Sequence, residues 1–215
     1  MPTATLMESL RTAIIDGDEQ QAPQIVKNAL GDRLGARQIL EEGLLSGMGE
    51  VGKRFREGEY FLPEVLVAAE AMKAAMAVLT PHLKQQNVAA RATALVGTVR
   101  GDLHDIGKNL VSIMLEGAGF EVVDLGVDVP PEKFVQACRD RKVDLVAMSA
   151  LLTTTMPEME LAIKTLQREL PNPPPVIIGG APVTQQYADR IGAAGYGRDA
   201  ATGAEVARRL CAARA

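Results

Sequence analysis

The 215-residue sequence contains no tryptophan, two cysteines and two histidines. The cysteines, Cys138 and Cys211, lie far apart and form no C-x-x-C pair, which argues against both a disulfide framework and a zinc knuckle. Two isolated cysteines are typical of a protein in a reducing cytosol. The histidines, His82 and His104, fall in different predicted domains, so neither a zinc site nor a di-iron site is expected.

Long apolar segments and a surplus of basic residues are also lacking. No apolar stretch reaches the ~20 residues that a membrane-spanning helix needs. The net charge of −4 gives no electrostatic reason to expect a nucleic-acid partner. The N-terminus carries acids and lacks the basic and apolar regions of a signal peptide. We therefore expect a cytoplasmic protein that has neither a membrane nor a nucleic acid as its partner.

The first part of the chain, from residue 6 to about residue 87, is predicted to be helical. Its apolar residues recur at every third and fourth position in four segments, and Pro63 occupies the first turn of the fourth segment. Four amphipathic segments with short connections favour an antiparallel four-helix bundle. Residues 80–91, which include Pro81 and a polar run, are predicted to be the linker. We place the all-α domain over residues 1–88 and a second domain over residues 89–215.

The second domain shows five repeats of a strand followed by a helix. Its apolar runs are continuous, which is typical of a buried parallel sheet with helices on both faces. The fold class is therefore a four-helix bundle followed by an α/β domain with a doubly wound, parallel, five-stranded sheet of flavodoxin-like order, 2-1-3-4-5. The strands are expected at residues 93–99, 120–125, 143–149 and 176–178 and near residue 194. The helices are expected at residues 107–116, 131–140, 157–170, 184–190 and 203–213.

The predicted strand order also predicts where a ligand binds. In a sheet of order 2-1-3-4-5 the crevice opens beyond the carboxyl ends of the first and third strands. The loops at that position are residues 101–107 and residues 149–155, which contain most of the polar motifs of the chain. We expect these two loops to form one site.

The first of these loops contains the hexapeptide Asp102-Leu103-His104-Asp105-Ile106-Gly107 between a predicted strand and a predicted helix. A histidine that binds a metal needs an acceptor for its second ring nitrogen, and Asp102 can reach back to His104. Gly107 removes a Cβ where the helix begins, so that a bulky planar ligand can approach the backbone. A lone histidine between two aspartates is also typical of a hydrogen-bonded residue at a helix N-terminus.

The Asp-x-His-x-x-Gly hexapeptide, in its strand-loop-helix setting, resembles the corrinoid proteins of methyltransferase systems, including the cobalamin-binding module of cobalamin-dependent methionine synthase. The resemblance extends over nearly the whole chain. It implies a cobalamin cofactor (methylcobalamin or a related corrinoid) with His104 as the metal ligand below cobalt, in place of the cofactor's benzimidazole. Asp102 and Thr155 would complete a hydrogen-bond relay with His104. Methionine synthase has serine at the position of Thr155, so the hydroxyl group is kept.

The resemblance also implies a wider set of residues that contact the cofactor. A helical cap would lie over the upper face of the corrin, and the loops after the third and fourth strands would line the nucleotide tail. The residues so implied, besides Thr155, are Asp102, His104, Asp105, Ile106, Gly107, Ser149, Leu151, Thr153, Gly179, Gly180, Phe55, Leu62 and Val65. The alternatives are that the last three belong to the core of the bundle, that a threonine caps the helix near Pro157, and that the two glycines form a plain turn after a strand.

The function implied by the resemblance is that of a methyl carrier. The partners would be a substrate-specific methyltransferase, a second acceptor methyltransferase and a reductive activase, and the chain would be a subunit rather than a complete enzyme. A cobalamin-dependent sensor or regulator is the main alternative, but such proteins carry a DNA-binding domain and a tryptophan in the cap, and this chain has no tryptophan. The small subunit of a mutase resembles the second domain alone. A storage or delivery protein stays open.

Overall fold

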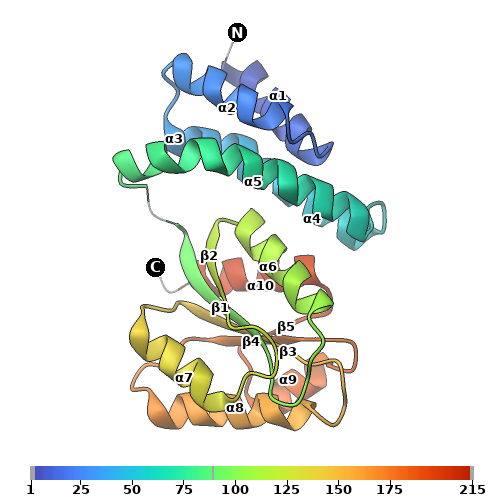
Figure 1. The fold of residues 1–215 in the computed structure, drawn as a ribbon. Helices are drawn as coiled ribbons and strands as arrows, with labels where there is room; N and C mark the ends of the chain where they lie inside the picture. Colours follow the sequence, from blue (N-terminus) through green and yellow to red (C-terminus); the bar gives the residue numbers. More distant parts are fainter. Residues whose placement is uncertain (1–2, 89, 214–215) are drawn as a thin grey trace. The chain divides into compact units, whose positions relative to one another are not determined.

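The computed structural model describes residues 3–88 and 90–213, and these form two compact units (Figure 1). In the first unit, Met1–Ala90, the described secondary-structure elements are all helices, and the second, Arg91–Ala215, has helices on both faces of a sheet. The all-α and α/β classes expected from the two periodicities are confirmed.

The helical unit has four helical segments, the third of which changes pitch along its length. Helix α5 packs against α2, whereas α1 packs against η1 and α4. Gly43 and Gly47 allow this close approach, because a Cβ at either position would lie within 3 Å of the side chain of Leu10 or Ile14 in α1. The bounds are α1 (Thr3–Ile15), α2 (Gln21–Gly31), α3 (Ala36–Gln38), the π-helix η1 (Ile39–Leu45), α4 (Ser46–Glu57) and α5 (Leu62–Gln85).

The linker prediction is wrong at its N-terminal end, because α5 continues through Pro81 as far as Gln85. A proline inside a helix removes one backbone hydrogen bond and usually ends the helix. Here Leu79 and Leu83 are both buried, so the apolar face of α5 continues on both sides of the proline. Thr80 donates a side-chain hydrogen bond of 2.7 Å to the carbonyl of Met76 in the preceding turn. Packing of the apolar face therefore outweighs the local preference at this proline.

The α/β unit contains a five-stranded parallel sheet whose order, β2-β1-β3-β4-β5, confirms the predicted topology. Helices α6 and α10 pack together on one face, and α7, α8 and α9 cover the other (Figure 1). The strands are β1 (Ala92–Thr98), β2 (Phe120–Asp124), β3 (Leu145–Ser149), β4 (Val176–Gly179) and β5 (Gly195–Gly197). The helices are α6 (Ile106–Gly117), α7 (Pro131–Asp140), α8 (Met156–Glu169), α9 (Gln185–Ile191) and α10 (Ala200–Ala212).

The register of the two central strands positions the site. Thr98 at the end of β1 pairs with Ser149 at the end of β3, and the Val99 amide donates to the Ser149 carbonyl at 3.1 Å. The strands therefore end side by side, and the loops that follow them leave the sheet at the same level. Below this edge Gly97 gives room to the fully buried ring of Phe134, since a Cβ on Gly97 would lie 2.9 Å from Cζ of that ring.

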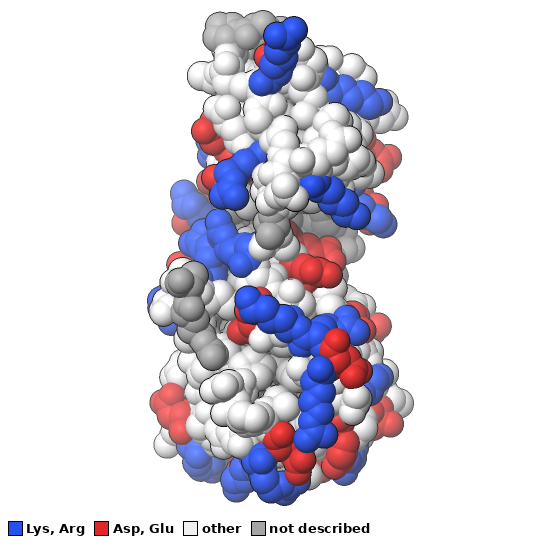
Figure 2. Space-filling model, turned by 90° about the vertical axis from the view of Figure 1, so that its left-hand side faces the viewer, with Lys and Arg blue, Asp and Glu red and all other residues white. Residues whose placement is uncertain are grey.

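The surface carries charges of both signs. On the face drawn in Figure 2, basic and acidic side chains lie interspersed. Ion pairs between exposed side chains include Arg139 with Glu169 and Lys164 with Glu160. Across residues 3–88 and 90–213, none of the helices has the length and hydropathy needed to cross a membrane.

Candidate functional site

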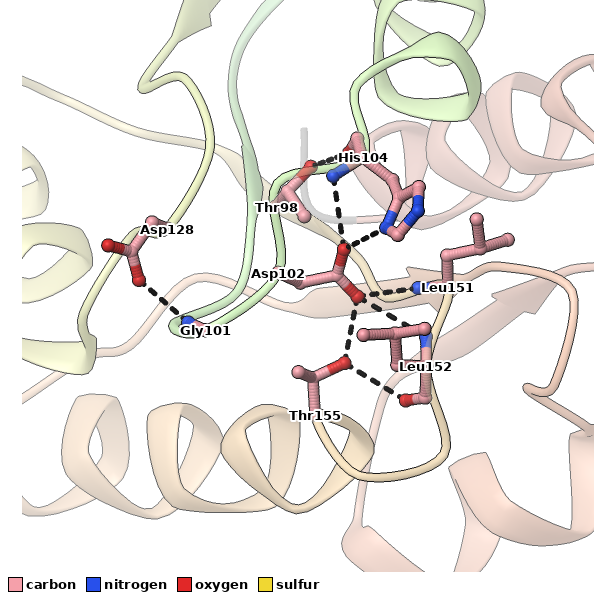
Figure 3. A network of polar contacts seen from close by, with 8 residues as sticks. All are labelled: Thr98, Gly101, Asp102, His104, Asp128, Leu151, Leu152 and Thr155. Carbon is pink, nitrogen blue, oxygen red and sulfur yellow. Dashed lines mark hydrogen bonds and ion pairs between the residues drawn. The ribbon is translucent and has the colours of Figure 1, made fainter.

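The centre of the site is the carboxylate of Asp102, which lies in the loop after β1 and has no exposed surface. Its Oδ1 accepts a hydrogen bond of 3.1 Å from the His104 amide and lies 2.7 Å from His104 Nδ1 (Figure 3). Its Oδ2 accepts hydrogen bonds from the amides of Leu151 and Leu152, at 2.8 and 3.3 Å, and from the Thr155 hydroxyl at 2.8 Å. The two loops predicted to form one site therefore meet at this carboxylate.

The charge of Asp102 follows from these contacts. Burial alone would raise the pKa of the carboxyl group, but hydrogen bonds from His104, Leu151 and Thr155 outweigh it and hold the pKa well below its usual range. Asp102 is therefore ionised at neutral pH and can only accept hydrogen bonds. An acceptor 2.7 Å from His104 Nδ1 requires that this nitrogen carry a proton.

The imidazole of His104 has one nitrogen held and the other free. Its side chain is 51% exposed, and Asp102 fixes the orientation of the ring through Nδ1. Nε2 has no hydrogen-bond partner in the part of the chain that the structure describes. Because the proton of the neutral ring is on Nδ1, Nε2 presents a lone pair to its surroundings. This is the arrangement of a histidine that is prepared to bind a metal.

The backbone of the histidine loop is fixed by its neighbours as well. The fully buried Thr98 at the end of β1 donates a hydrogen bond of 2.8 Å from its hydroxyl to the carbonyl of His104. Gly101 adopts a positive φ of 77°, and its amide donates to Asp128 Oδ1 at 2.6 Å. Neither Thr98 nor Asp128 was among the predicted site residues. Their contacts involve backbone atoms, which leave no recognisable motif in the sequence.

Large apolar side chains surround His104 on the protein surface. Leu103 and Ile106 are 72% and 71% exposed, and Leu151 and Leu152 are 43% and 42% exposed. Neighbouring exposed apolar groups of this size are typical of a surface that binds something. At Gly107 a Cβ would meet no atom within 4 Å, so packing within the protein does not require a glycine there. The surface around the histidine is thus open and apolar, as the binding of a large planar ligand would require.

The expectation that a threonine side chain caps the helix near Pro157 is wrong. Thr155 precedes the first residue of α8, but its side chain makes no capping hydrogen bond. Its hydroxyl instead lies 2.8 Å from Asp102 Oδ2 and 2.9 Å from the carbonyl of Leu152. Because a hydroxyl has one proton, it donates to one of these acceptors at a time. A buried carboxylate competes successfully with the helix terminus for this group.

The other predicted residues of the α/β unit lie at the same edge of the sheet. Ser149 ends β3 and is partly exposed, and Thr153 is exposed in the loop that follows. Asp105 accepts a hydrogen bond of 3.2 Å from Asn109 in the first turn of α6. Gly180 has a φ of 132°, and a Cβ there would lie 1.9 Å from the Ala150 carbonyl. Packing within the protein therefore requires a glycine at position 180, whether or not a cofactor contacts it.

Four predicted cofactor contacts are left. Three of these residues belong to the helical unit, and the fourth, Gly179, ends β4. Phe55 is partly exposed at the end of α4, Leu62 is 37% exposed at the start of α5, and Val65 is fully buried. A Cβ on Gly179 would lie 3.0 Å from the Gly197 carbonyl in β5. Contacts of these four residues with a cofactor stay predictions.

A buried lysine anchors the first turn of α6, the helix that begins two residues after His104. The Lys108 side chain is only 3% exposed, and its ammonium group forms an ion pair with Asp124 at the end of β2. It also donates a hydrogen bond of 2.6 Å to Asn109. The pair ties the start of α6 to the sheet and so helps to hold the histidine loop from its C-terminal side.

Replacing Lys108 with methionine is expected to lower the free energy of unfolding by about 1–2 kcal/mol. Methionine preserves the buried apolar stem, and Asp124, which is 43% exposed, can turn to water when its partner is lost. Urea unfolding of the apo-protein measures the change. Lys164→Met is the matched control, because Lys164 is 65% exposed and its pair with Glu160 lies on the surface. Equal stability of the two variants would contradict a structural role for Lys108.

Comparison with known proteins agrees with this geometry. The family model described as a B12 binding domain matches residues 92–205, and a second model with the same description matches residues 6–80. A corrinoid protein of Desulfitobacterium hafniense strain Y51 is 38% identical over 210 residues, covering 96% of this chain and 97% of its own. The dimethylamine corrinoid protein of Methanosarcina barkeri is 41% identical over 214 residues, and the match covers 99% of this chain and 100% of that protein.

A solved structure extends the comparison to a complex. A chain in the crystal structure of the methanol:cobalamin methyltransferase complex MtaBC from Methanosarcina barkeri superimposes with a TM-score of 0.83 at 30% identity. The match covers 98% of this chain and 81% of that one. Both units thus have counterparts in cobalamin proteins, and the chain belongs to the family of corrinoid proteins of methyltransferase systems, whose cofactor is cobalamin.

Proposed function

We propose that the chain carries a methyl group on its cobalamin between two methyltransferases, with Nε2 of His104 as the protein ligand of cobalt. The observation that carries the proposal is the state of the His104 ring. Its Nδ1 faces a buried, ionised carboxylate at 2.7 Å, and its Nε2 is free on an exposed apolar surface. A carrier role is supported by the relatives, which are corrinoid proteins named for dimethylamine and trimethylamine and part of a methanol:cobalamin methyltransferase complex.

The cofactor, when bound, supplies a cobalt ion that accepts and gives up a methyl group. The protein's part is to offer one nitrogen in a fixed direction. Asp102 accepts a hydrogen bond from Nδ1–H, which keeps the lone pair on Nε2 and raises the basicity of the ring. A ligand from the protein would occupy the position of the cofactor's benzimidazole, which we propose is displaced. Ser149 and Thr153, at the carboxyl end of β3, are the groups that we propose contact the nucleotide tail.

The Asp102–His104 pair can also hold a proton. When Nε2 is not bound to cobalt, it can accept a proton from water while Nδ1–H stays on Asp102 Oδ1. The carboxylate of Asp102 keeps its charge, because hydrogen bonds from His104, Leu151 and Thr155 hold its pKa well below its usual range. We propose that release of the histidine is coupled to proton uptake at Nε2.

The proposed partners are a substrate-specific methyltransferase, a second acceptor methyltransferase and a reductive activase. The test loads the protein with cobalamin, reduces it, and adds one candidate methyltransferase with methanol, a methylamine, a methoxylated aromatic or a betaine. A carrier is expected to become methylated, as seen in its visible spectrum, only when a donor and its methyltransferase are both present. The second enzyme should then remove the methyl group.

The outcome distinguishes this function from its alternatives. A storage or delivery protein would hold cobalamin and release it to another protein, but no methyltransferase would methylate it while bound. A sensor or regulator would bind a partner differently after its cobalamin had lost a ligand, and it would not consume a methyl donor. Failure of all candidate methyltransferases to act on the bound cofactor would contradict the carrier proposal.

A further inference from the structure

We propose that Asp128, in the loop between β2 and α7, is a positioning residue that sets the histidine loop for binding cobalt. This inference rests on the function proposed above. Asp128 is exposed and lies 24 residues from His104 in the numbering, outside the hexapeptide motif. Its role is indirect, because its hydrogen bonds are to the backbone of Gly101 (Figure 3) and of Asp102 and not to His104 itself.

Two hydrogen bonds connect Asp128 to the histidine loop. Its Oδ1 accepts from the Gly101 amide at 2.6 Å, and its own amide donates to the Asp102 carbonyl at 3.0 Å. The first is a bond to a charged acceptor, which is shorter and stronger than a neutral one. The two bonds bracket the peptide group between Gly101 and Asp102, so they fix the direction in which the Asp102 side chain leaves the backbone.

The β2–α7 loop is itself attached to the sheet on both sides of Asp128. The Thr98 amide donates to the Gly126 carbonyl at 3.0 Å, and the Val129 amide donates to the Thr98 carbonyl at 2.9 Å. Thr98 is also the residue whose hydroxyl holds the His104 carbonyl at 2.8 Å. The loop and the histidine segment therefore share one fixed reference, the end of β1.

The conformation of Asp128 supports a specific role. Its φ is 52°, in the left-handed region, where a residue other than glycine carries a conformational cost and aspartate and asparagine are tolerated best. Gly101, its hydrogen-bond donor, also has a positive φ, of 77°. Two neighbouring turns with positive φ therefore face each other and are joined by the bond of 2.6 Å.

Asp128 therefore acts on the histidine indirectly, through Asp102. Asp102 orients the His104 ring through the contact of 2.7 Å at Nδ1, and Asp128 orients Asp102 through its backbone. Groups that orient a metal-binding histidine commonly change metal affinity by 10–100-fold when they are removed. We expect the lower part of that range for Asp128, because it acts through one intervening residue.

Three substitutions separate the hydrogen bond from the backbone conformation. Asp128→Asn keeps an acceptor oxygen and tolerates positive φ. Asp128→Gly tolerates positive φ but removes the acceptor, and Asp128→Ala removes the acceptor and disfavours positive φ. If the acceptor is what matters, asparagine should behave like the wild type, whereas glycine and alanine should both be impaired.

The measurement is the electron paramagnetic resonance spectrum of the holo-protein with its cobalt reduced to Co(II), in which a bound histidine nitrogen splits the signal. In Asp128→Gly the ratio of histidine-bound to histidine-free cobalt is expected to fall about tenfold, and in Asp128→Asn it should stay within about twofold of the wild type. In the apo-protein, hydrogen exchange of the Gly101 amide should be about tenfold faster in Asp128→Gly. The second readout needs no cofactor.

The controls distinguish failure of this inference from failure of the proposed function. If the wild type shows no nitrogen splitting, or shares its spectrum with His104→Ala, the axial-ligand proposal is wrong. If the wild type shows the splitting and Asp128→Gly keeps it unchanged, the positioning role of Asp128 is overturned and the proposed function stands. Loss of the splitting in Asp128→Asn as strongly as in Asp128→Gly would also overturn it, because the acceptor is present in the asparagine variant.

Discussion

Replacing His104 with alanine is expected to remove the histidine nitrogen from cobalt while leaving the fold intact. The side chain is 51% exposed, and among the described residues its ring is hydrogen-bonded to Asp102 alone. The backbone bonds of residue 104, to the Asp102 carboxylate and from the Thr98 hydroxyl, do not depend on the ring. The loss of unfolding free energy should therefore be about 1 kcal/mol or less. The functional loss should be large, because His104 is the only histidine in the sequence of the α/β unit.

The Co(II) resonance spectrum measures this effect directly. The wild type is expected to show the splitting from one nitrogen, and His104→Ala should lack it. Methyl transfer by His104→Ala should fall by about 100-fold or more, since even residues that merely orient such a ligand are worth 10–100-fold. Adding free imidazole should restore part of the splitting, because the alanine leaves the space of the ring open.

The chain offers a matched control for this substitution. His82 is the only other histidine, and it lies in the last turns of α5 in the helical unit. His82→Ala should leave the cobalt spectrum and the methyl-transfer rate unchanged. Identical spectra of the wild type and His104→Ala would contradict the assignment of the ligand. A changed spectrum in His82→Ala would mean that the ligand had been assigned to the wrong histidine.

The α/β architecture was predictable because each element carries its own signal. Continuous apolar runs flanked by amphipathic segments indicate buried parallel strands and covering helices. The strand order then follows from a common topology, and with it the convergence of the loops that contain Asp102 and Thr155. A motif of six residues could be recognised because its chemistry depends on side chains.

Contacts made by backbone atoms could not be predicted in the same way. The Leu151 and Leu152 amides donate to Asp102, but any residue other than proline has such an amide. Asp128 contributes through a loop conformation that only the folded chain reveals. Tertiary packing also overrode a local signal at Pro81, where burial of Leu83 extends α5 past the proline. Long-range packing and backbone geometry are therefore the parts of the site that sequence patterns do not contain.

Replacing Asp102 with asparagine is expected to damage both stability and ligand geometry. The carboxylate accepts from the His104 amide and Nδ1 on one oxygen, and from two leucine amides and the Thr155 hydroxyl on the other. Asparagine has only one acceptor oxygen, and its amide nitrogen can only donate. Whichever way the asparagine side chain turns, its NH₂ group therefore faces protein groups that are themselves hydrogen-bond donors.

Each orientation of the asparagine has a definite consequence. With its oxygen towards Leu151 and Thr155, the NH₂ group opposes the His104 amide and favours a ring whose Nδ1 accepts and whose Nε2 carries the proton. That tautomer has no lone pair for cobalt. With the opposite orientation, the partly buried amides of Leu151 and Leu152 lose their acceptor. Because a buried unsatisfied donor costs about 1–3 kcal/mol, we expect the apo-protein to lose about 2–4 kcal/mol of unfolding free energy and the holo-protein to lose the nitrogen splitting.

The dependence on pH supplies a further check on Asp102. Its pKa in the folded protein is lowered, so its contribution to stability is complete above its unfolded pKa of about 3.9 and is lost as pH falls below that value towards the folded pKa. The stability difference between the wild type and Asp102→Asn, measured by urea unfolding of the apo-proteins, should therefore be largest near pH 7 and shrink below about pH 4.

The exposed aspartate of the same motif provides the comparison for this substitution. Asp105 accepts only from Asn109 at 3.2 Å, an interaction that an asparagine side chain can keep. Asp105→Asn should thus unfold at nearly the same urea concentration as the wild type at every pH. A stability difference between the wild type and Asp102→Asn that stayed constant from pH 7 to acid would mean that ionisation of Asp102 does not hold the two loops together.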